Sequence, residues 1–186
     1  MLAQIDVTNI RIETERLTLR PWEQSDLEDL YDYACVEGVG EMAGWMHHKD
    51  REESQRILDM FIQGKKTFAL ELKENGKVIG SLGIEKHNTE EFDDPNLQGR
   101  ELGYVLSKEY WGKGLMPEAV SAVIRFCFET LHYDFISCSH FKRNPRSKRV
   151  IEKSGFSYLK DISYETQYGT VEPTRLYVQY NPSLER

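Results

Sequence analysis

The chain has 186 residues, of which 39% are hydrophobic and 30% are charged, and its 31 acidic and 24 basic side chains give a net charge of −7. This length allows one domain with a core that needs no disulfide or metal to fold. The composition excludes a disordered chain, and the negative charge argues against a broad nucleic-acid-binding surface. No apolar run reaches the length of about 18 residues that a membrane span needs, and no secretory signal is recognisable, so we expect a cytoplasmic protein that does not bind membranes.

The cysteines and histidines predict no metal or disulfide chemistry. Cys35, Cys127 and Cys138 form no C-x-x-C pair, and their odd number leaves one thiol unpaired. This pattern argues against a disulfide framework and a zinc site. His47 and His48 are adjacent and have no third ligand at metal-site spacing. We therefore expect reduced cysteines and no bound metal.

The first half of the chain predicts two helices and three strands. A strand is expected at 17–20, and Ser25-Asp26 begins an amphipathic helix that ends near Ala34. Asp50 and Glu53 have the spacing of a capping box for a second helix, which ends near Gly64. Strand-like runs at 67–72 and 77–85 follow, with Asn75-Gly76 as the tight turn of a hairpin.

The second half continues the alternation without a regular βαβ repeat. Residues 86–99 are polar and are expected to form a surface excursion. The elements predicted after it are a strand at 101–106, a largely buried helix at 115–131, a strand at 135–139, a basic helix at 144–153 and strands at 158–164 and 175–180. This order favours one α+β or α/β domain with a mixed sheet.

Charge is distributed unevenly along the chain. Residues 22–60 contain eleven acids and three bases, whereas 142–149 contain five bases and no acid. The two segments favour ligands of opposite charge, with solvated helix faces as the alternative interpretation.

A glycine-containing loop joins the strand that ends at Leu106 to the helix that begins at Leu115. Gly112 and Gly114 allow a ligand to approach the backbone, and the helix N-terminus adds a partial positive charge of roughly half a unit. Pro117 fits the first turn, where its missing N–H would be unpaired anyway. The loop therefore predicts phosphate binding, with an ordinary strand-to-helix turn as the alternative.

Two common phosphate loops do not fit this segment. A Walker A loop needs Ser or Thr after Gly-Lys, but Gly112-Lys113 is followed by Gly114. A dinucleotide fingerprint needs a third glycine at the position that Pro117 occupies. ATP hydrolysis and NAD binding are therefore not expected.

Several segments together resemble the GCN5-related N-acetyltransferase (GNAT) superfamily, and in particular its ribosomal-protein N-terminal acetyltransferases. These segments follow the family's order and lie at 16–22, 80–83, 101–104, 110–114, 144–147 and 155–156. The pyrophosphate loop departs from the family motif at its first position, where Glu109 replaces Gln or Arg. The resemblance implies one α+β domain over residues 1–186, with a core at about 15–180 and a mixed, mostly antiparallel sheet of about six to seven strands.

The resemblance also implies that acetyl-CoA binds in a wedge where the parallel strands 101–106 and 135–139 splay apart. A backbone N–H near Val105 or Leu106 would polarise the thioester carbonyl. Asn144 and Ser147 would contact the pantetheine arm. The pyrophosphate would be held by Trp111, Gly112, Lys113, Gly114, Leu115 and Met116. We further expect the basic segment at 142–149 to attract the phosphates of CoA.

Direct transfer to an amine requires a base and a means of stabilising the leaving thiolate. The family often places an acid where Glu101 stands, so we predict Glu101 as the base, with Glu85 or water as alternatives. Many members use a tyrosine seven residues after the helix asparagine as the acid, but this chain has Ile151. Ser147 lies on the same helix face as Asn144 and is predicted to hydrogen-bond the sulfur, with water as the proton source.

The loop before the second helix borders the acceptor site in this family, so Trp45 and His47 are predicted to contact the amine, with core or surface packing as the alternative. Glu85, at the end of the strand 77–85, is also predicted to contact the amine. The acidic segment 22–60 suggests a cationic acceptor. The predicted function is acetyl-CoA-dependent acetylation of a protein N-terminus or a small cationic amine. The alternatives are a non-catalytic acyl-CoA-binding module and, less favoured, an ATP-binding protein that uses the same loop. Homodimers also occur in this family.

Overall fold

The computed structural model describes residues 5–87, 90–92, 94 and 96–183. These residues form one sheet of eight strands in the order β1-β2-β3-β4-β5-β6-β8-β7. The strands are β1 (Ile12–Glu13), β2 (Leu17–Pro21), β3 (Thr67–Leu72), β4 (Val78–Glu85), β5 (Gly99–Leu106), β6 (Phe135–Phe141), β7 (Ser157–Glu165) and β8 (Val171–Tyr180). Seven of them lie at predicted positions, and the two-residue β1 is an addition at the edge.

The sheet is mixed, as predicted. Every neighbouring pair is antiparallel except β5 and β6, which are parallel. The helices that flank this sheet are α1 (Leu27–Ala34), α2 (Arg51–Gly64), α3 (Leu115–Arg125) and α4 (Pro145–Lys153). The α+β class is therefore confirmed.

Local side-chain bonds explain where two of the helices begin. Asp50 accepts a hydrogen bond from the backbone N–H of Glu53 at 2.8 Å, and the Glu53 carboxylate accepts one from the N–H of Lys49 at 2.8 Å. The first bond satisfies an N–H group that the first turn of α2 leaves without a partner, and the second ties the residue before the N-cap to that turn. Asn144 caps α4 in the same way, because its Oδ1 accepts a hydrogen bond from the Ser147 N–H at 3.2 Å.

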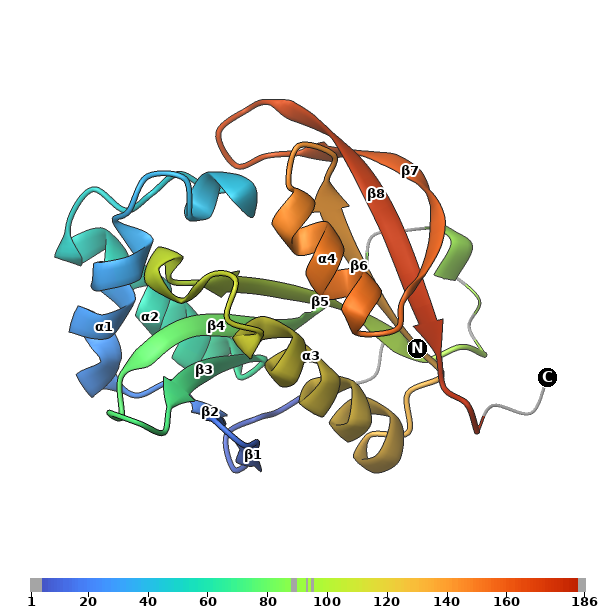
Figure 1. Cartoon of the computed structure of the whole chain (residues 1–186), viewed down its shortest axis with the longest axis horizontal. Coiled ribbons are helices and arrows are strands. Elements are labelled where there is room, and N and C mark those ends of the chain that lie inside the picture. Colours follow the sequence, from blue (N-terminus) through green and yellow to red (C-terminus); the bar gives the residue numbers. More distant parts are fainter. Residues whose placement is uncertain (1–4, 88–89, 93, 95, 184–186) are drawn as a thin grey trace.

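The helices cover the two faces of the sheet, with α3 and α4 on one face and α1 and α2 on the other (Figure 1). The larger core joins the apolar face of α3 to the strands, and Val120 and Val123 are completely buried there. The predicted helix at 115–131 changes at Phe126 into a π-helical turn that ends at Thr130. Within the described ranges, no helix is long and apolar enough to cross a bilayer.

The excursion at 86–99 is not purely a surface segment, which corrects the prediction. Phe92 lies in a 3₁₀ turn, is only 3% exposed, and stacks on Phe135 with ring centroids 4.2 Å apart. The two rings join Leu176 and Val178 in a small third core. Positions 88, 89, 93 and 95 of the excursion lie outside the described residues.

Candidate active site

The parallel strands β5 and β6 pair over only part of their length. Their paired positions run from Gly99 with Phe135 to Leu102 with Cys138. Beyond Leu102, β5 still pairs with β4, and beyond Cys138, β6 still pairs with β8. The two strands therefore diverge as expected. Residues 103–106 of β5 do not pair with β6.

The glycine loop lies at the end of β5 beside this wedge. Gly112 and Gly114 have φ angles of +78° and +76°, which residues other than glycine rarely adopt. Gly114 is the N-cap of α3, and no side chain caps the N–H groups of the first turn. Those N–H groups can therefore bind an anion.

Arg16 fastens this loop to the rest of the domain. Its Nη1 donates a hydrogen bond to the Lys113 carbonyl at 2.9 Å, and its Nη2 lies 2.8 Å from Glu118 Oε2. Glu118 also accepts a hydrogen bond from Thr14 Oγ1 at 2.6 Å. The motif at 16–22 therefore supports the glycine loop from β2, a contact that the sequence analysis does not predict.

The basic segment at 142–149 is partly neutralised by acidic partners from other positions in the chain. Three of its five bases form ion pairs, Lys142 with Asp161, Arg143 with Glu172 and Lys148 with Glu152. Arg146 lies over the ring of Trp111, with its guanidinium carbon 4.5 Å from the ring centroid. Arg146 is thus the basic residue of this segment that lies beside the glycine loop.

Two carboxylates lie side by side on the sheet near the start of the wedge. Glu85 on β4 is the register partner of Glu101 on β5, and Gly83 is the partner of Gly103. A Cβ atom on Gly83 would lie 2.6 Å from Glu85 Oε1, so the Glu85 side chain folds over the paired glycines. Gly83 and Gly103 thus form a part of the sheet surface that has no side chains of its own, which we call the glycine floor, and the Glu85 side chain lies over it.

Their surroundings distinguish the two carboxylates. Burial raises the pKa of Glu101, and the charge of Glu85 raises it further, whereas a hydrogen bond from Ser139 Oγ at 2.8 Å lowers it. Glu85 forms an ion pair with Lys66. A carboxylate with a raised pKa is a stronger base, so the structure favours Glu101 over Glu85 for accepting a proton.

Tyr164 on β7 interacts electrostatically with both carboxylates. Burial raises the pKa of its phenol, and the charges of Glu101 and Glu85 raise it further. Its ring packs against Phe141, with centroids 5.4 Å apart, and a Cβ atom on Gly44 would lie 2.8 Å from it. The segment between α1 and α2 therefore rests on Tyr164.

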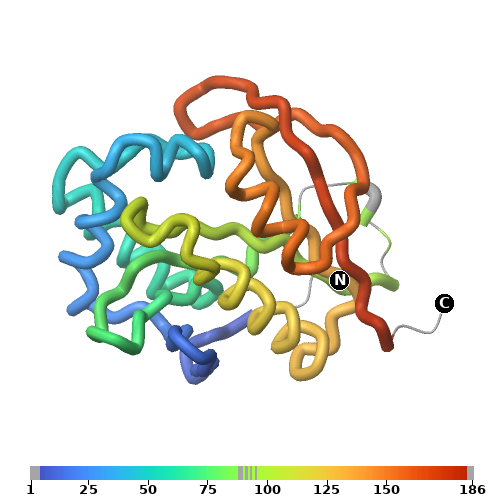
Figure 2. The backbone as a smooth tube through the Cα atoms, viewed as in Figure 1, coloured from blue at the N-terminus to red at the C-terminus, as the bar shows by residue number. Residues whose placement is uncertain are grey.

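Arg143 holds this α1–α2 segment in place. Its Nη2 donates hydrogen bonds to the Glu41 carbonyl at 3.0 Å and to Tyr168 Oη at 3.3 Å. The carbonyl of Gly44 accepts a further hydrogen bond from the N–H of Gln167 at 2.8 Å. Figure 2 shows the α1–α2 segment, in light blue, facing the turn between β6 and α4 at the upper edge of the view.

The predicted acceptor residues Trp45 and His47 lie in this segment. Trp45 packs on Gly40 and on the His48 ring, with ring centroids 5.2 Å apart. The Nδ1 atom of His47 lies 2.7 Å from Glu41 Oε1. Burial alone would raise the pKa of Glu41, but its hydrogen bonds, the largest from His47, lower it to about 2. Both predicted side chains thus make contacts within their own segment.

The predicted cofactor residues of α4 lie across the wedge from β5. Ser147 Oγ is 2.9 Å from the hydroxyl of Tyr104, which is two residues beyond the last β5–β6 pair. Ile151 is completely buried in the core beneath α4 and carries no proton. Val105 and Leu106 lie on the diverging part of β5, and the Leu106 carbonyl accepts a hydrogen bond from Trp111 Nε1 at 2.8 Å.

The sequence analysis assigns no role to four side chains of this region. They are Lys66, Tyr104, Ser139 and Tyr164. Tyr104 and Ser139 each end a segment that the analysis does single out, the motif at 101–104 and the strand at 135–139. The other two come from distant elements, and no local pattern connects them to Glu101.

The cysteines lie away from any nucleophilic arrangement. Burial raises the pKa of Cys127 to about 12 and also raises that of Cys138. A thiol with a raised pKa is a poor nucleophile at neutral pH. Across the part of the chain that is described, no three His, Cys, Asp or Glu side chains are arranged to hold a metal ion.

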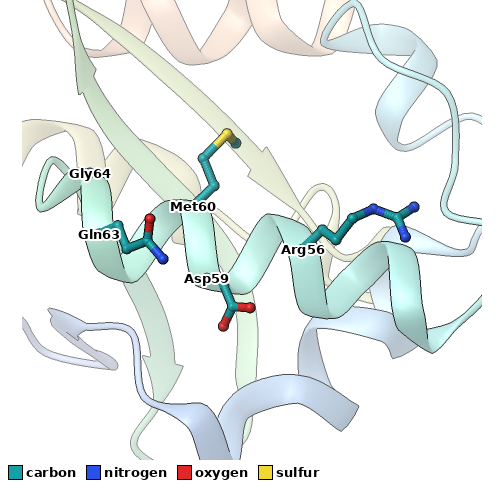
Figure 3. Close-up of a pocket in the computed structure, with 5 residues that line it drawn as sticks. All are labelled: Arg56, Asp59, Met60, Gln63 and Gly64. Atoms are coloured by element: carbon teal, nitrogen blue, oxygen red, sulfur yellow. The ribbon is translucent and has the colours of Figure 1, made fainter.

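A hollow on the outer face of α2 is separate from this region (Figure 3). It is lined by Arg56, Asp59, Met60, Gln63 and Gly64. Because all five residues belong to one helix, no second element forms an opposite wall. This hollow is therefore a surface depression and not the active site.

Comparisons with known proteins agree with this geometry. Residues 16–157 match the family described as acetyltransferase (GNAT) domain. An N-acetyltransferase p20 of Bacillus licheniformis, itself uncharacterised, is 31% identical over 149 residues, which are 77% of this chain and 80% of that protein. A [ribosomal protein uS5]-alanine N-acetyltransferase of Escherichia coli is 27% identical over 169 residues and covers 84% of each chain.

Solved structures share the fold at lower identity. A GNAT-family acetyltransferase from Bacillus anthracis superposes with a TM-score of 0.80 at 21% identity, over 92% of this chain and 99% of that one. A spermidine N-acetyltransferase from Vibrio cholerae, solved with CoA and spermine, has a TM-score of 0.71 at 17% identity, over 89% and 96%. With the family match over residues 16–157 and the diverging parallel strands beside a glycine loop, the chain belongs to the GNAT family of N-acetyltransferases.

Proposed function

We propose that the protein transfers the acetyl group of acetyl-CoA directly to a small, cationic primary amine. The observation that supports this most strongly is the divergence of β5 and β6 after Leu102 and Cys138, with the glycine loop at the end of β5. Acetyl-CoA is the acetyl donor in this proposal. The solved relative that contains CoA supports a CoA-linked donor for this fold.

The donor-binding residues fit an anionic ligand with a long flexible arm. The N–H groups from Gly112 to Met116 bind the pyrophosphate at the start of α3, where the helix dipole favours negative charge. The Trp111 N–H does not take part, because it donates to the Lys108 carbonyl at 3.3 Å. Arg146 lies over Trp111 and adds a positive charge beside this loop. The backbone of residues 103–105 that does not pair with β6 binds the pantetheine arm, and an N–H near Val105 or Leu106 polarises the carbonyl. The Leu106 carbonyl is already bonded to Trp111 Nε1.

Glu101 accepts the proton of the incoming ammonium group. Its burial favours the protonated carboxyl, and its hydrogen bond from Ser139 fixes the orientation of Oε1. Gly83 and Gly103 have no side chains of their own, so the Glu85 side chain that lies over them is the group that the amine meets beside Glu101. Ser147, at the start of α4, donates a hydrogen bond to the sulfur as it leaves.

The acceptor region favours a cation. Glu101 and Glu85 lie directly opposite each other beside the glycine floor, and the charges of both raise the pKa of Tyr164. The predicted preference for a cation therefore rests on these groups rather than on the acidic segment 22–60, where Asp26 and Asp32 are paired with Arg20 and Lys77. The ammonium group of Lys66 forms an ion pair with Glu85, and the proposed substrate carries a group of the same kind.

Two measurements test this proposal. Acetyl-CoA and CoA, but not ATP or NADH, should raise the melting temperature, and at 100 times the dissociation constant the stabilisation should be about 2.7 kcal/mol. Release of free thiol should then be followed with spermidine, a monoamine of similar length, and a peptide with an N-terminal alanine.

The outcomes separate the candidate functions. Turnover of spermidine above that of the monoamine would support the cationic acceptor, whereas turnover of the peptide alone would assign a protein N-terminus. CoA binding without turnover of any amine would indicate a non-catalytic acyl-CoA-binding protein, and stabilisation by ATP alone would contradict the assignment of the glycine loop.

A further inference from the structure

A pair of hydroxyl groups spans the wedge between β5 and α4. The phenol oxygen of Tyr104 lies 2.9 Å from Ser147 Oγ and 3.3 Å from the Ser147 carbonyl oxygen. Tyr104 follows the last β5–β6 pair by two residues, and Ser147 lies in the first turn of α4. The pair thus connects the two elements that border the diverging strands.

The 3.3 Å contact requires Tyr104 to donate to the Ser147 carbonyl, whereas either hydroxyl can donate in the 2.9 Å contact, so the single phenol hydrogen has two possible acceptors. A phenol is a stronger hydrogen-bond donor than an alkyl hydroxyl, so the shorter contact is best made with Tyr104 donating to Ser147 Oγ. Burial raises the pKa of Tyr104 well above its usual value, which keeps the phenol protonated and able to donate. The hydrogen of the Ser147 hydroxyl is then available for a third group.

We infer that Tyr104 is a positioning residue, which fixes the Ser147 hydroxyl so that its hydrogen points to the sulfur of the acetyl donor. This inference rests on the proposed acetyl transfer. Because a hydroxyl that accepts one hydrogen bond donates a stronger one, Tyr104 also strengthens the bond that Ser147 makes. In many family members a tyrosine at the position of Ile151 acts as the acid. In this chain the Tyr104–Ser147 pair would stabilise the leaving sulfur in its place.

The reaction balances without proton transfer from Tyr104. The amine nitrogen bonds to the carbonyl carbon, the C–S bond breaks, and its electron pair stays on sulfur. The ammonium group loses one proton to Glu101 before the attack, and Glu101 passes it to solvent. The second proton leaves the nitrogen after the attack and reaches solvent by the same route. The sulfur leaves as a thiolate, which the Ser147 hydroxyl stabilises until water protonates it.

The test uses the full chain with Tyr104→Phe, Ser147→Ala and the double variant, and Tyr31→Phe on α1 as the matched control. Loss of the Tyr104 hydroxyl leaves the Ser147 hydroxyl free to rotate, and we expect kcat to fall about tenfold with little change in KM for acetyl-CoA. In the Ser147→Ala background, removing the Tyr104 hydroxyl should cause no further loss, because Tyr104 acts through Ser147.

A second readout needs no turnover. The ultraviolet absorption of the CoA thiolate, titrated in the complex, reports the pKa of the bound thiol. A hydrogen bond to the thiolate lowers that pKa, so it should be about one unit higher in the Tyr104→Phe and Ser147→Ala complexes than in the wild type or the Tyr31→Phe control.

The results distinguish failure of this inference from failure of the proposed function. A wild-type protein that turns over amines, with unchanged kcat and thiol pKa in a folded Tyr104→Phe variant, would overturn the inference alone. Additive losses in the double variant would also contradict it, since Tyr104 would then act independently of Ser147. A wild-type protein that binds no CoA would overturn both.

Discussion

Glu101 on β5 lies directly opposite Glu85 on β4, and the neighbouring register pair is Gly83 with Gly103. Two like charges in register normally destabilise a sheet. Here one of them is offset by Lys66, and the other is buried with a hydrogen bond from Ser139. The same arrangement leaves Glu101 as the stronger base beside two glycines, and removal of a proton from an ammonium group requires such a base.

Replacement of Glu101 by Gln should lower kcat by about 10² to 10⁴-fold, the range typical of a lost general base, while the dissociation constant of acetyl-CoA stays within about twofold. The fall in rate is measured by thiol release, and the binding constant by calorimetry. Glu129→Gln, an exposed change on the π-helical turn that follows α3, provides the control and should be neutral. Unchanged kcat in a folded Glu101→Gln protein would remove Glu101 from the mechanism.

The pH dependence follows from the raised pKa of Glu101. A base acts when deprotonated, so kcat/KM should rise with pH through an apparent pKa above the ordinary value of 4.5. The hydrogen bond from Ser139 lowers the pKa of Glu101. Ser139→Ala should therefore move the acidic limb of the profile to higher pH, and a move to lower pH would contradict this account.

Stability should also respond to Glu101. Because the folded protein raises the pKa of Glu101, folding is favoured by its protonated form, and stability is lost as pH rises from 4.5 through the raised folded value. Gln cannot ionise, so Glu101→Gln should melt at a higher temperature than the wild type at neutral pH. The difference should shrink on acidification and disappear below pH 4.5. A variant that is less stable at neutral pH would count against the burial argument.

The glycine loop can be tested with matched backbone changes. Gly112 and Gly76 have φ angles of +78° and +72°, and a Cβ on either would meet no atom within 4 Å. Gly→Ala at each site should therefore cost a similar 1–2 kcal/mol or so of stability through backbone strain alone. Only Gly112→Ala should also weaken acetyl-CoA binding, by about tenfold, because a methyl group there blocks the approach of the pyrophosphate. Equal binding by the two variants would exclude the loop as the phosphate site.

Arg143 and Lys142 offer a test of the α1–α2 segment. Both form ion pairs with β-hairpin residues, but only Arg143 also holds the Glu41 carbonyl. Arg143→Ala should raise KM for the amine by about tenfold, a loss of about 1.4 kcal/mol in acceptor binding. Lys142→Ala should leave that KM unchanged, as expected for a surface ion pair. Steady-state kinetics with saturating acetyl-CoA distinguish the two, and equal values for both variants would show that the segment does not form the acceptor site.

The elements of this protein follow from local patterns, and these were predictable. Hydrophobic periodicity, the caps at Asp50 and Asn144, and the hairpin turn at Asn75-Gly76 depend on residues within a few positions of each other. The glycine loop between Leu106 and Leu115 is likewise a local signal. The resemblance of several short segments to one family added the wedge and Glu101, which periodicity alone does not indicate.

The functional surroundings were decided by contacts between residues far apart in the chain. Tyr104 and Ser147 are 43 positions apart, and Arg16 and Glu118 are 102 apart. The charge of the basic segment is lower than its composition indicates, because Asp161 and Glu172 from later strands pair with Lys142 and Arg143. Composition and spacing define which groups are available, but strand register and helix packing determine which of them come into contact. The pKa of Glu101 and the partner of Ser147 are therefore set by the tertiary structure.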